Sequence, residues 1–235
     1  DITPDGGYIL GGIRRVPGGN PWTSERPYVI KTDSLGNVEW EQVYGAMDTT
    51  NAPAYNVIAT QDGGYAFVGA LGKIKFTGND RVLPWVVKLD NMGDTIWTQT
   101  LYGKGPNPLY SRFIDVVELS DGSLVVCGQQ TIDNPDTTYA GVYRITGVIA
   151  KFSAQGDSIW SRNYMHPENV KSQYSEHELT SIVQTDDGGF AVAGYLLSAP
   201  PDTGTQDTWV VKVDSFGCLV PGCEVVSVPK IETSI

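Results

Sequence analysis

Arginine and aromatic side chains stand out in the segments that we predict to join strands. These residue types dominate binding hot spots, and recognition usually takes place on the loops of a rigid scaffold. We therefore predict that a ligand contacts the following residues: Trp22, Arg14, Arg81, Tyr110, Arg112, Tyr139, Tyr143 and Arg144. The alternative is that these side chains only pack the long loops against one another.

The four arginines in this set lie in different predicted loops and could converge on a carboxylate group, which keeps a glycan-cleaving enzyme as an alternative. Such an enzyme needs a pair of carboxylates or an arginine cluster in one central pocket. The chain has no Gly-x-Ser-x-Gly nucleophile elbow and no glycine-rich phosphate loop that opens a helix. These patterns favour binding without catalysis and without a cofactor.

A second group that could do chemistry is His166 and His177 with Glu168, Glu176 and Glu178. Histidine and carboxylate side chains bind transition metals, but structural sites need ligands at helical or turn spacing. The chain has only 2 histidines, and their spacing fits neither arrangement. We predict that this segment is a solvated loop and that it holds no metal.

Aspartates make up a third group. They fall in predicted tight turns without any basic residue between them: Asp5, Asp33, Asp62, Asp90, Asp94, Asp121, Asp157, Asp186, Asp187 and Asp214. We interpret them as turn formers and solubilising charges. A calcium-binding surface is the alternative, although no loop shows the alternating acidic spacing of a dedicated calcium site.

The elements that position these residues are internal repeats. The segment Asp5-Gly6-Gly7-Tyr8 returns, with small changes, at residues 62–65, 121–124 and 187–190. A lysine ends a second shared motif in each unit, namely Lys31, Lys88, Lys151 and Lys212. A tryptophan closes a third motif in three units, namely Trp40, Trp97 and Trp160. Because a catalytic group is needed once, we assign these recurring lysines and tryptophans to the architecture.

Each unit is predicted to form four antiparallel strands joined by alternating short and long connections. Asp-Gly turns and segments rich in β-branched and aromatic residues indicate strands, and no segment has a helical period. Repeated four-stranded units of this length are typical of a β-propeller, in which each unit is one blade. We place blades at residues 1–45, 46–103, 104–165 and 166–226 and a tail at 227–235. The predicted fold is therefore all-β, with long loops on one face and tight turns on the other.

Composition restricts the partners. The 235 residues are 40% hydrophobic with a net charge of −11, so a packed core is expected and a nucleic-acid partner is not. No apolar run approaches the roughly 20 residues of a membrane helix. Asp1 falls at the end of a predicted first strand, so we expect further blades upstream in a larger propeller.

The cysteines indicate the cellular compartment in which the protein is found. Cys218 and Cys223 flank Leu-Val-Pro-Gly, whose Pro-Gly turn could bring the two thiols within disulfide reach. A disulfide indicates an extracytoplasmic protein. Cys127 aligns with small apolar strand residues of the other units, so it is expected to be a buried, inert thiol.

The repeated Asp-Gly-Gly-Tyr, Val-Val-Lys-Leu-Asp and Gly-x-x-x-Trp pattern, with Cys218-x4-Cys223 near the end, resembles secreted β-propeller proteins exported by the type IX secretion system. In that group the cysteine element commonly precedes a C-terminal sorting domain, which is absent from this sequence. The pattern does not match quinone-dependent propellers, which need a vicinal cysteine pair and calcium-binding acids. The spacing of the sialidase Asp-box fails as well.

We therefore expect a secreted or cell-surface, non-catalytic module that binds a protein or a glycan through its long-loop face. Two alternatives stay open. One is the sialidase-like glycan hydrolase named above. The other is a purely structural part of a surface assembly with other subunits.

Overall fold

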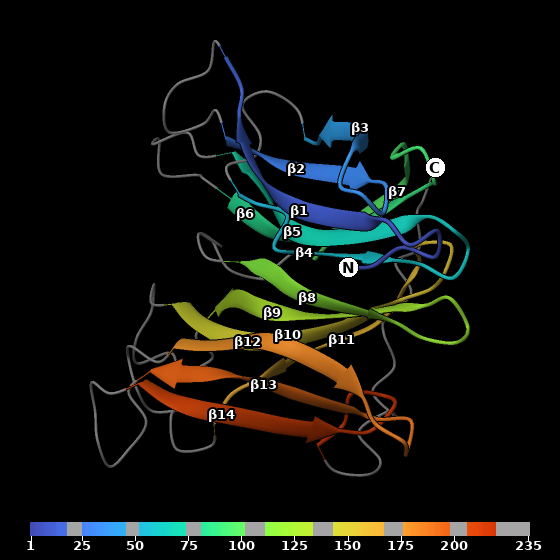
Figure 1. Cartoon of the computed structure of the whole chain (residues 1–235). Coiled ribbons are helices and arrows are strands. Elements are labelled where there is room, and N and C mark those ends of the chain that lie inside the picture. Colours follow the sequence, from blue (N-terminus) through green and yellow to red (C-terminus); the bar gives the residue numbers. More distant parts are fainter. Residues whose placement is uncertain are drawn as a thin grey trace, which may run out of the picture.

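The computed structural model describes residues 1–17, 25–45, 52–73, 81–101, 111–133, 143–166, 176–197 and 206–219. All regular secondary structure in these ranges is β-strand, which confirms the all-β class (Figure 1). Within the same ranges no helix is long and apolar enough to cross a membrane.

The strands follow the order of the repeats. The first unit contains β1 (Tyr8–Arg15), β2 (Glu25–Thr32) and β3 (Val38–Val43). The second contains β4 (Asn56–Ala59), β5 (Tyr65–Lys73), β6 (Arg81–Leu89) and β7 (Thr95–Thr100). The third contains β8 (Arg112–Glu118), β9 (Leu124–Asp133), β10 (Tyr143–Phe152) and β11 (Ser158–Tyr164). The fourth contains β12 (Glu176–Gln184), β13 (Phe190–Leu197) and β14 (Gln206–Val213).

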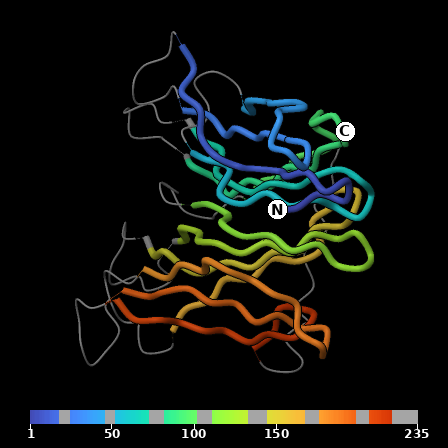
Figure 2. Tube along the Cα trace, in the orientation of Figure 1, coloured from blue at the N-terminus to red at the C-terminus, as the bar shows by residue number. Residues whose placement is uncertain are grey.

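Neighbouring strands within each unit pair antiparallel and in chain order. A single parallel bridge, Ile145 with Glu176, links the third unit to the fourth in one hydrogen-bonded sheet. The sheets lie one after another, from the first unit to the fourth, as Figure 2 shows along the chain trace. The β4–β5, β8–β9 and β12–β13 turns all project to the same side of the molecule (Figure 1).

Several strands are longer than the sequence predicted. Arg14, Arg81, Arg112, Tyr143 and Arg144 were expected in long loops, but all five lie in strands. The antiparallel ladders continue past the apolar residues because the backbone hydrogen bonds do not depend on side-chain polarity. Antiparallel pairing therefore carries polar side chains to the strand ends opposite the tight turns.

Side-chain alternation explains how the sheets stack. On β5, Tyr65 and Phe67 enter the core shared with the first sheet, whereas Ala66 and Val68 enter the core shared with the third. Successive side chains of a strand point to opposite faces, so a sheet covered on both sides needs apolar residues at every position. A third core joins the third and fourth units and contains Cys127, which is fully buried as expected.

The repeated lysine of the second unit is held by the turn aspartate. Lys88 is 4% exposed, and its Nζ lies 2.8 Å from Asp62 Oδ2. Asp62 also accepts hydrogen bonds from the hydroxyl of Thr60 and the backbone N–H of Gly64. Burial alone would raise the pKa of Asp62, but the bonds from Lys88, Thr60 and Gly64 lower it to about 2. Corresponding pairs occur in the other units, namely Lys31 with Asp5, Lys151 with Asp121 and Lys212 with Asp187.

The repeated tryptophans lie between neighbouring units. Each ring packs on a turn glycine of the following unit, where an added Cβ would come within 2.9 Å of ring atoms. The pairs are Trp40 with Gly93, Trp97 with Gly156, and Trp160 with Gly217. All three glycines have positive φ, so a larger residue there would be strained as well as crowded.

Cys218 is disulfide-bonded. Its predicted partner, Cys223, lies outside the described residues, as does the predicted tail 227–235. The pairing of these two cysteines therefore stays a prediction.

We expect Gly64→Ser to lower the free energy of unfolding by about 1–3 kcal/mol. A Cβ at this position would overlap the Leu89 carbonyl oxygen and lie 2.8 Å from Lys88 Nζ. The third unit has Ser123 at the corresponding place, and there the Lys151–Asp121 distance is 3.7 Å instead of 2.8 Å. Urea unfolding measures the difference.

The matched control is Ser123→Gly, which removes the side chain that takes the place of the glycine. It is expected to change stability by less than about 1 kcal/mol, because the closer lysine pair offsets the added chain entropy of glycine. Equal losses for both variants would contradict the role assigned to this glycine.

Candidate functional site

Buried and half-buried polar side chains gather at the strand ends opposite the tight turns of the third and fourth units. We call them the loop-end cluster, which consists of Arg112, Thr131, Arg144, His177, Glu178 and Tyr195. They come from the starts of β8, β10 and β12 and from the ends of β9 and β13. Polar groups are buried only at a cost in free energy, so their concentration at one end marks a candidate site.

Arg112 and Glu178 form an ion pair between the third and fourth units. Arg112 Nε and Nη2 donate to the two carboxylate oxygens at 3.2 and 2.7 Å, which is the bidentate arrangement. The Glu178 side chain is 5% exposed and the Arg112 side chain 31% exposed. The pair is therefore shielded on the glutamate side and open to a ligand on the arginine side.

Two tyrosines complete this arrangement. The Tyr195 hydroxyl donates to Glu178 Oε2 at 2.6 Å, and the Arg112 guanidinium carbon lies 5.7 Å from the centre of the Tyr55 ring. Burial, and then the hydrogen bond to Glu178, raise the pKa of Tyr195, so its hydroxyl stays a donor at neutral pH. The guanidinium is thus held in one orientation before any ligand arrives.

Arg112 and Glu178 occupy equivalent places in the repeat. Each lies nine residues before its turn aspartate, since 121 − 112 = 9 and 187 − 178 = 9, and the second unit has Pro53 there. Architectural residues such as the turn lysines recur in every unit, whereas these residues differ in type and charge. Because the residue type changes from unit to unit at this repeat position, we infer that Arg112 and Glu178 have a role specific to the junction of the third and fourth units.

Arg144 is the second arginine of the cluster. It is 2% exposed, and among the residues that the structure describes neither its Nε nor its Nη1 has a hydrogen-bond partner. The hydroxyl oxygen of Thr131 is likewise buried without a partner in the described ranges. A buried guanidinium without acceptors is costly, so an acceptor from outside the described part of the chain is expected to complete it.

His177 corrects the prediction of a solvated loop. It lies in β12, is 0% exposed and packs against Trp209 with ring centres 5.1 Å apart. Its Nε2 accepts the backbone N–H of His166 at 3.0 Å, and its Nδ1 lies 3.3 Å from the Ile145 carbonyl oxygen. This places the proton on Nδ1, and burial lowers the pKa of the ring.

The segment was mistaken for a loop because β12 begins at Glu176, ahead of its first apolar residue. Two carboxylates at its start, Glu176 and Glu178, share one face of the strand. Burial, and then the charge of Glu178, raise the pKa of Glu176. Glu168 lies outside the described residues, and within those that are described no cluster of metal-ligating side chains occurs.

Three other predicted contacts, Arg14, Arg81 and Tyr143, lie in strands and do not belong to the loop-end cluster as defined above. Arg14 is exposed on the first sheet, where it pairs with Glu41 at 2.9 Å and lies over the Tyr28 ring. Arg81 and Tyr143 are the first residues of β6 and β10. The remaining predicted contacts, Trp22, Tyr110 and Tyr139, lie outside the described residues.

Sequence reasoning missed Glu178, Tyr195 and Tyr55. The break in the repeat at Arg112 and Glu178 was a usable signal, because it requires only an alignment of the four units. The contacts of the two tyrosines depend on how adjacent units stack, which no local pattern shows.

The comparisons with known proteins are sparse. No family model matches the sequence, and no curated protein matches it. One solved structure that aligns is MPT-4, a mannose phosphorylase from Leishmania mexicana, with 13% identity, a TM-score of 0.45, and coverage of 89% of this chain and 64% of that chain. A protein of unknown function from Bacteroides caccae aligns at 11% identity with a TM-score of 0.29, covering 88% of this chain and 74% of the other.

A thermostable family-43 glycoside hydrolase aligns at 10% identity with a TM-score of 0.37 over 88% of this chain and 74% of the other. The present chain thus spans less than two thirds of the length of the mannose phosphorylase. At TM-scores below 0.5, these similarities assign neither an activity nor a ligand to this chain.

Proposed function

We propose that this chain is part of a secreted or cell-surface β-propeller and serves as a non-catalytic binding module. Its loop-end cluster engages an anionic group of a protein or glycan, and other subunits of a surface assembly are possible partners. The disulfide at Cys218 supports an extracytoplasmic location.

Contacts between the first strands of successive units support the propeller arrangement. Asn56 of the second unit donates to Asp115 of the third, and Asp115 Oδ2 accepts the N–H of Ile182 in the fourth at 2.8 Å. Asp1 Oδ2 likewise accepts the N–H of Ala59 at 3.0 Å. In a propeller the first strands line the axis, so a chain of such contacts is expected there.

The observation that best supports a binding function is the burial of the Arg144 guanidinium without enough hydrogen-bond acceptors from the described residues. Two of its buried nitrogen atoms have no acceptor in the described part of the chain, and a carboxylate or sulfate group provides two acceptors in the matching geometry. Arg112 is already oriented by Glu178 and Tyr55 at the same end of the sheets. Both arginines were predicted ligand contacts, and their positive charge and hydrogen-bond donors support an anionic group as the ligand.

A glycan hydrolase is the second candidate function. The raised pKa of Glu176 and its neighbour Glu178 on the same strand face favour it, because glycosidases use two carboxyl groups. Against it, Glu178 is committed to Arg112 and Tyr195. Glu178 is therefore not free to act as a nucleophile or base, and Glu176 would have to act without it.

A panel of carboxylated and sulfated glycans, acidic peptides and their uncharged counterparts tests the proposal. We expect anionic ligands to bind, with affinity falling as salt rises, and to be recovered intact. Failure of every anionic ligand to bind would refute it. If wild type releases a cleavage product and the Glu176→Gln variant does not, the protein is a hydrolase and the proposal of a non-catalytic binding module is wrong.

A further inference from the structure

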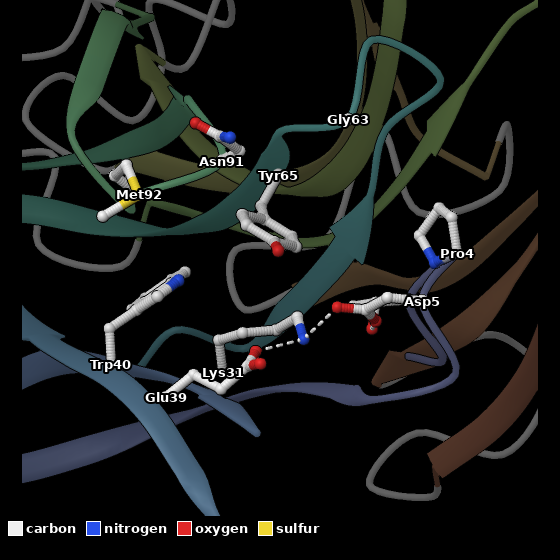
Figure 3. Close-up of a pocket in the computed structure, with 10 residues that line it drawn as sticks. Pro4, Asp5, Lys31, Glu39, Trp40, Gly63, Tyr65, Asn91 and Met92 are labelled. Atoms are coloured by element: carbon white, nitrogen blue, oxygen red, sulfur yellow. Dashed lines mark hydrogen bonds and ion pairs between the residues drawn. The ribbon is translucent and has the colours of Figure 1, made fainter. Parts of the chain in front are cut away.

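A hollow of about 400 Å³ lies between the first and second sheets, among the tight turns and away from the loop-end cluster. Figure 3 shows the Trp40 and Tyr65 rings beside it, with the Lys31 stem passing below Tyr65. Its volume is within the range of small-molecule sites. The sequence predicted recognition on the opposite, long-loop face, so this hollow was not anticipated.

One side of the hollow is aromatic and apolar. The Trp40 and Tyr65 rings meet edge to face with centres 5.5 Å apart, and Met92 is 63% exposed beside them. An indole ring offers a flat apolar surface with a polarised N–H at its edge. The C–H face of a pyranose ring has the shape to pack on such a surface.

The polar side of the hollow offers groups without internal partners. Within the described ranges, no hydrogen bond engages Trp40 Nε1–H, the Tyr65 hydroxyl, the Asn91 amide or Glu39 Oε1, although all four residues line the hollow. By contrast, the equivalent Trp97 Nε1–H donates to the Ala154 carbonyl oxygen at 3.0 Å. The free groups include both donors and acceptors, which is what hydroxyl groups require.

The charge of the hollow selects against anions. The three donors of Lys31 Nζ are taken by Asp5 at 2.8 Å, the Thr32 carbonyl at 2.9 Å and Glu39 at 2.6 Å. Two carboxylates therefore face one ammonium group, and the ammonium has no donor left. An anionic ligand is repelled here, whereas a neutral polyhydroxyl ligand meets acceptors at no electrostatic cost.

The polar residues are peculiar to this junction of units. Glu39 corresponds to Ile96 and Ile159 in the next two units, and Asn91 corresponds to Ala154 in the third. The two isoleucines are 56% and 46% exposed, so an apolar residue at that place is compatible with the fold. Glu39 accepts a hydrogen bond from the buried Lys31, but the equally buried Lys88 is held by Asp62 and the Leu89 carbonyl, with Ile96 at the place of Glu39. The fold can therefore form without Glu39 or Asn91, and a ligand is a further reason for them.

We propose that this hollow binds the pyranose ring of a neutral sugar, with its C–H face on Trp40 and its hydroxyl groups on Glu39 and Asn91. The site is separate from the anionic-ligand site of the loop-end cluster. It would allow the module to hold two parts of a glycan, or two glycans, at opposite ends of its sheets.

The experiment follows the Trp40 indole N–H in an NMR spectrum of the labelled chain, with the resonance assigned by Trp40→Phe. The probes are the methyl glycosides of glucose, galactose, mannose and N-acetylglucosamine, and choline serves as a cationic control. We expect at least one sugar, and not choline, to shift the Trp40 signal in a saturable way.

The matched variant is Glu39→Ile combined with Asn91→Ala, which copies the residues of the next junction. It is expected to keep its melting temperature and to bind the sugar at least about tenfold more weakly. A Trp40 signal that no sugar shifts, a response to choline alone, or equal sugar affinity in the double variant would each overturn the proposal. Neutral probes and the Trp40 signal report on this hollow alone, so the result is independent of the anionic-ligand panel.

Discussion

Arg112→Ala is expected to lower the free energy of unfolding by about 3–5 kcal/mol. The substitution removes both hydrogen bonds to Glu178, whose side chain is 5% exposed. Of the partners that the described residues supply, the Glu178 carboxylate then keeps only the Tyr195 hydroxyl. A buried carboxylate has lost its hydration, and without its counterion nothing compensates for that loss. Removing one partner therefore destabilises the fold by more than the intact ion pair stabilises it. Urea unfolding of wild type and variant gives the difference.

The chain provides a matched control in Arg14→Ala. Arg14 and Glu41 form an ion pair of similar length, but their side chains are 49% and 46% exposed, so its loss should cost far less stability than the loss of Arg112. A double variant, Arg112→Met with Glu178→Leu, should recover most of the stability lost in Arg112→Ala, because no charge is then left buried. If Arg112→Ala costs no more than Arg14→Ala, the stacking of the third unit on the fourth is wrong.

Much of the architecture follows from local patterns that each unit repeats. Asp62 begins a tight turn whose Gly63 has a φ of 83°, and this geometry leaves few alternatives to a hairpin. Alternation along β5 then places Tyr65 and Phe67 on one face and Ala66 and Val68 on the other. These features depend on neighbours in sequence, so they could be predicted from the sequence.

The candidate site could be predicted only in part, because it depends on contacts between units. Arg112 was recognised by residue type, but Glu178 and His177 were assigned to a solvated loop. The start of β12 is polar, so apolar alternation indicates the strand only from Leu179 onward. Polar residues at a strand end are stabilised by tertiary partners such as Arg112, and sequence periodicity does not show those partners.

The hollow beside Trp40 could not be predicted from the sequence. Trp40, Trp97 and Trp160 share one repeat position, yet only Trp97 of the three donates its indole N–H to the next unit within the described residues. The difference arises from the packing of each junction. The residues Glu39 and Asn91, which break the repeat there, become informative only once their positions in space are known.

Arg144→Met is expected to raise stability and to abolish binding of anionic ligands in the same variant. Methionine has a similar length and packs in an apolar site, whereas the buried Nε and Nη1 of Arg144 have no acceptor among the described residues. Removing such a group should stabilise the chain by about 1–3 kcal/mol. For a chain of this size that corresponds to a rise in Tm of roughly 2–4 °C per kcal/mol.

A purely structural arginine cannot give this combination, because its removal costs stability. Residues kept for function often reduce stability, so opposite changes in Tm and in affinity for a carboxylated or sulfated ligand distinguish the two roles. Arg144→Lys is the control, since it keeps the buried charge but loses the planar fork, and we expect weaker binding without the gain in Tm. A loss of stability in Arg144→Met comparable to that of Arg112→Ala would mean that Arg144 has an internal acceptor, and the anionic-ligand site would then lose its main support.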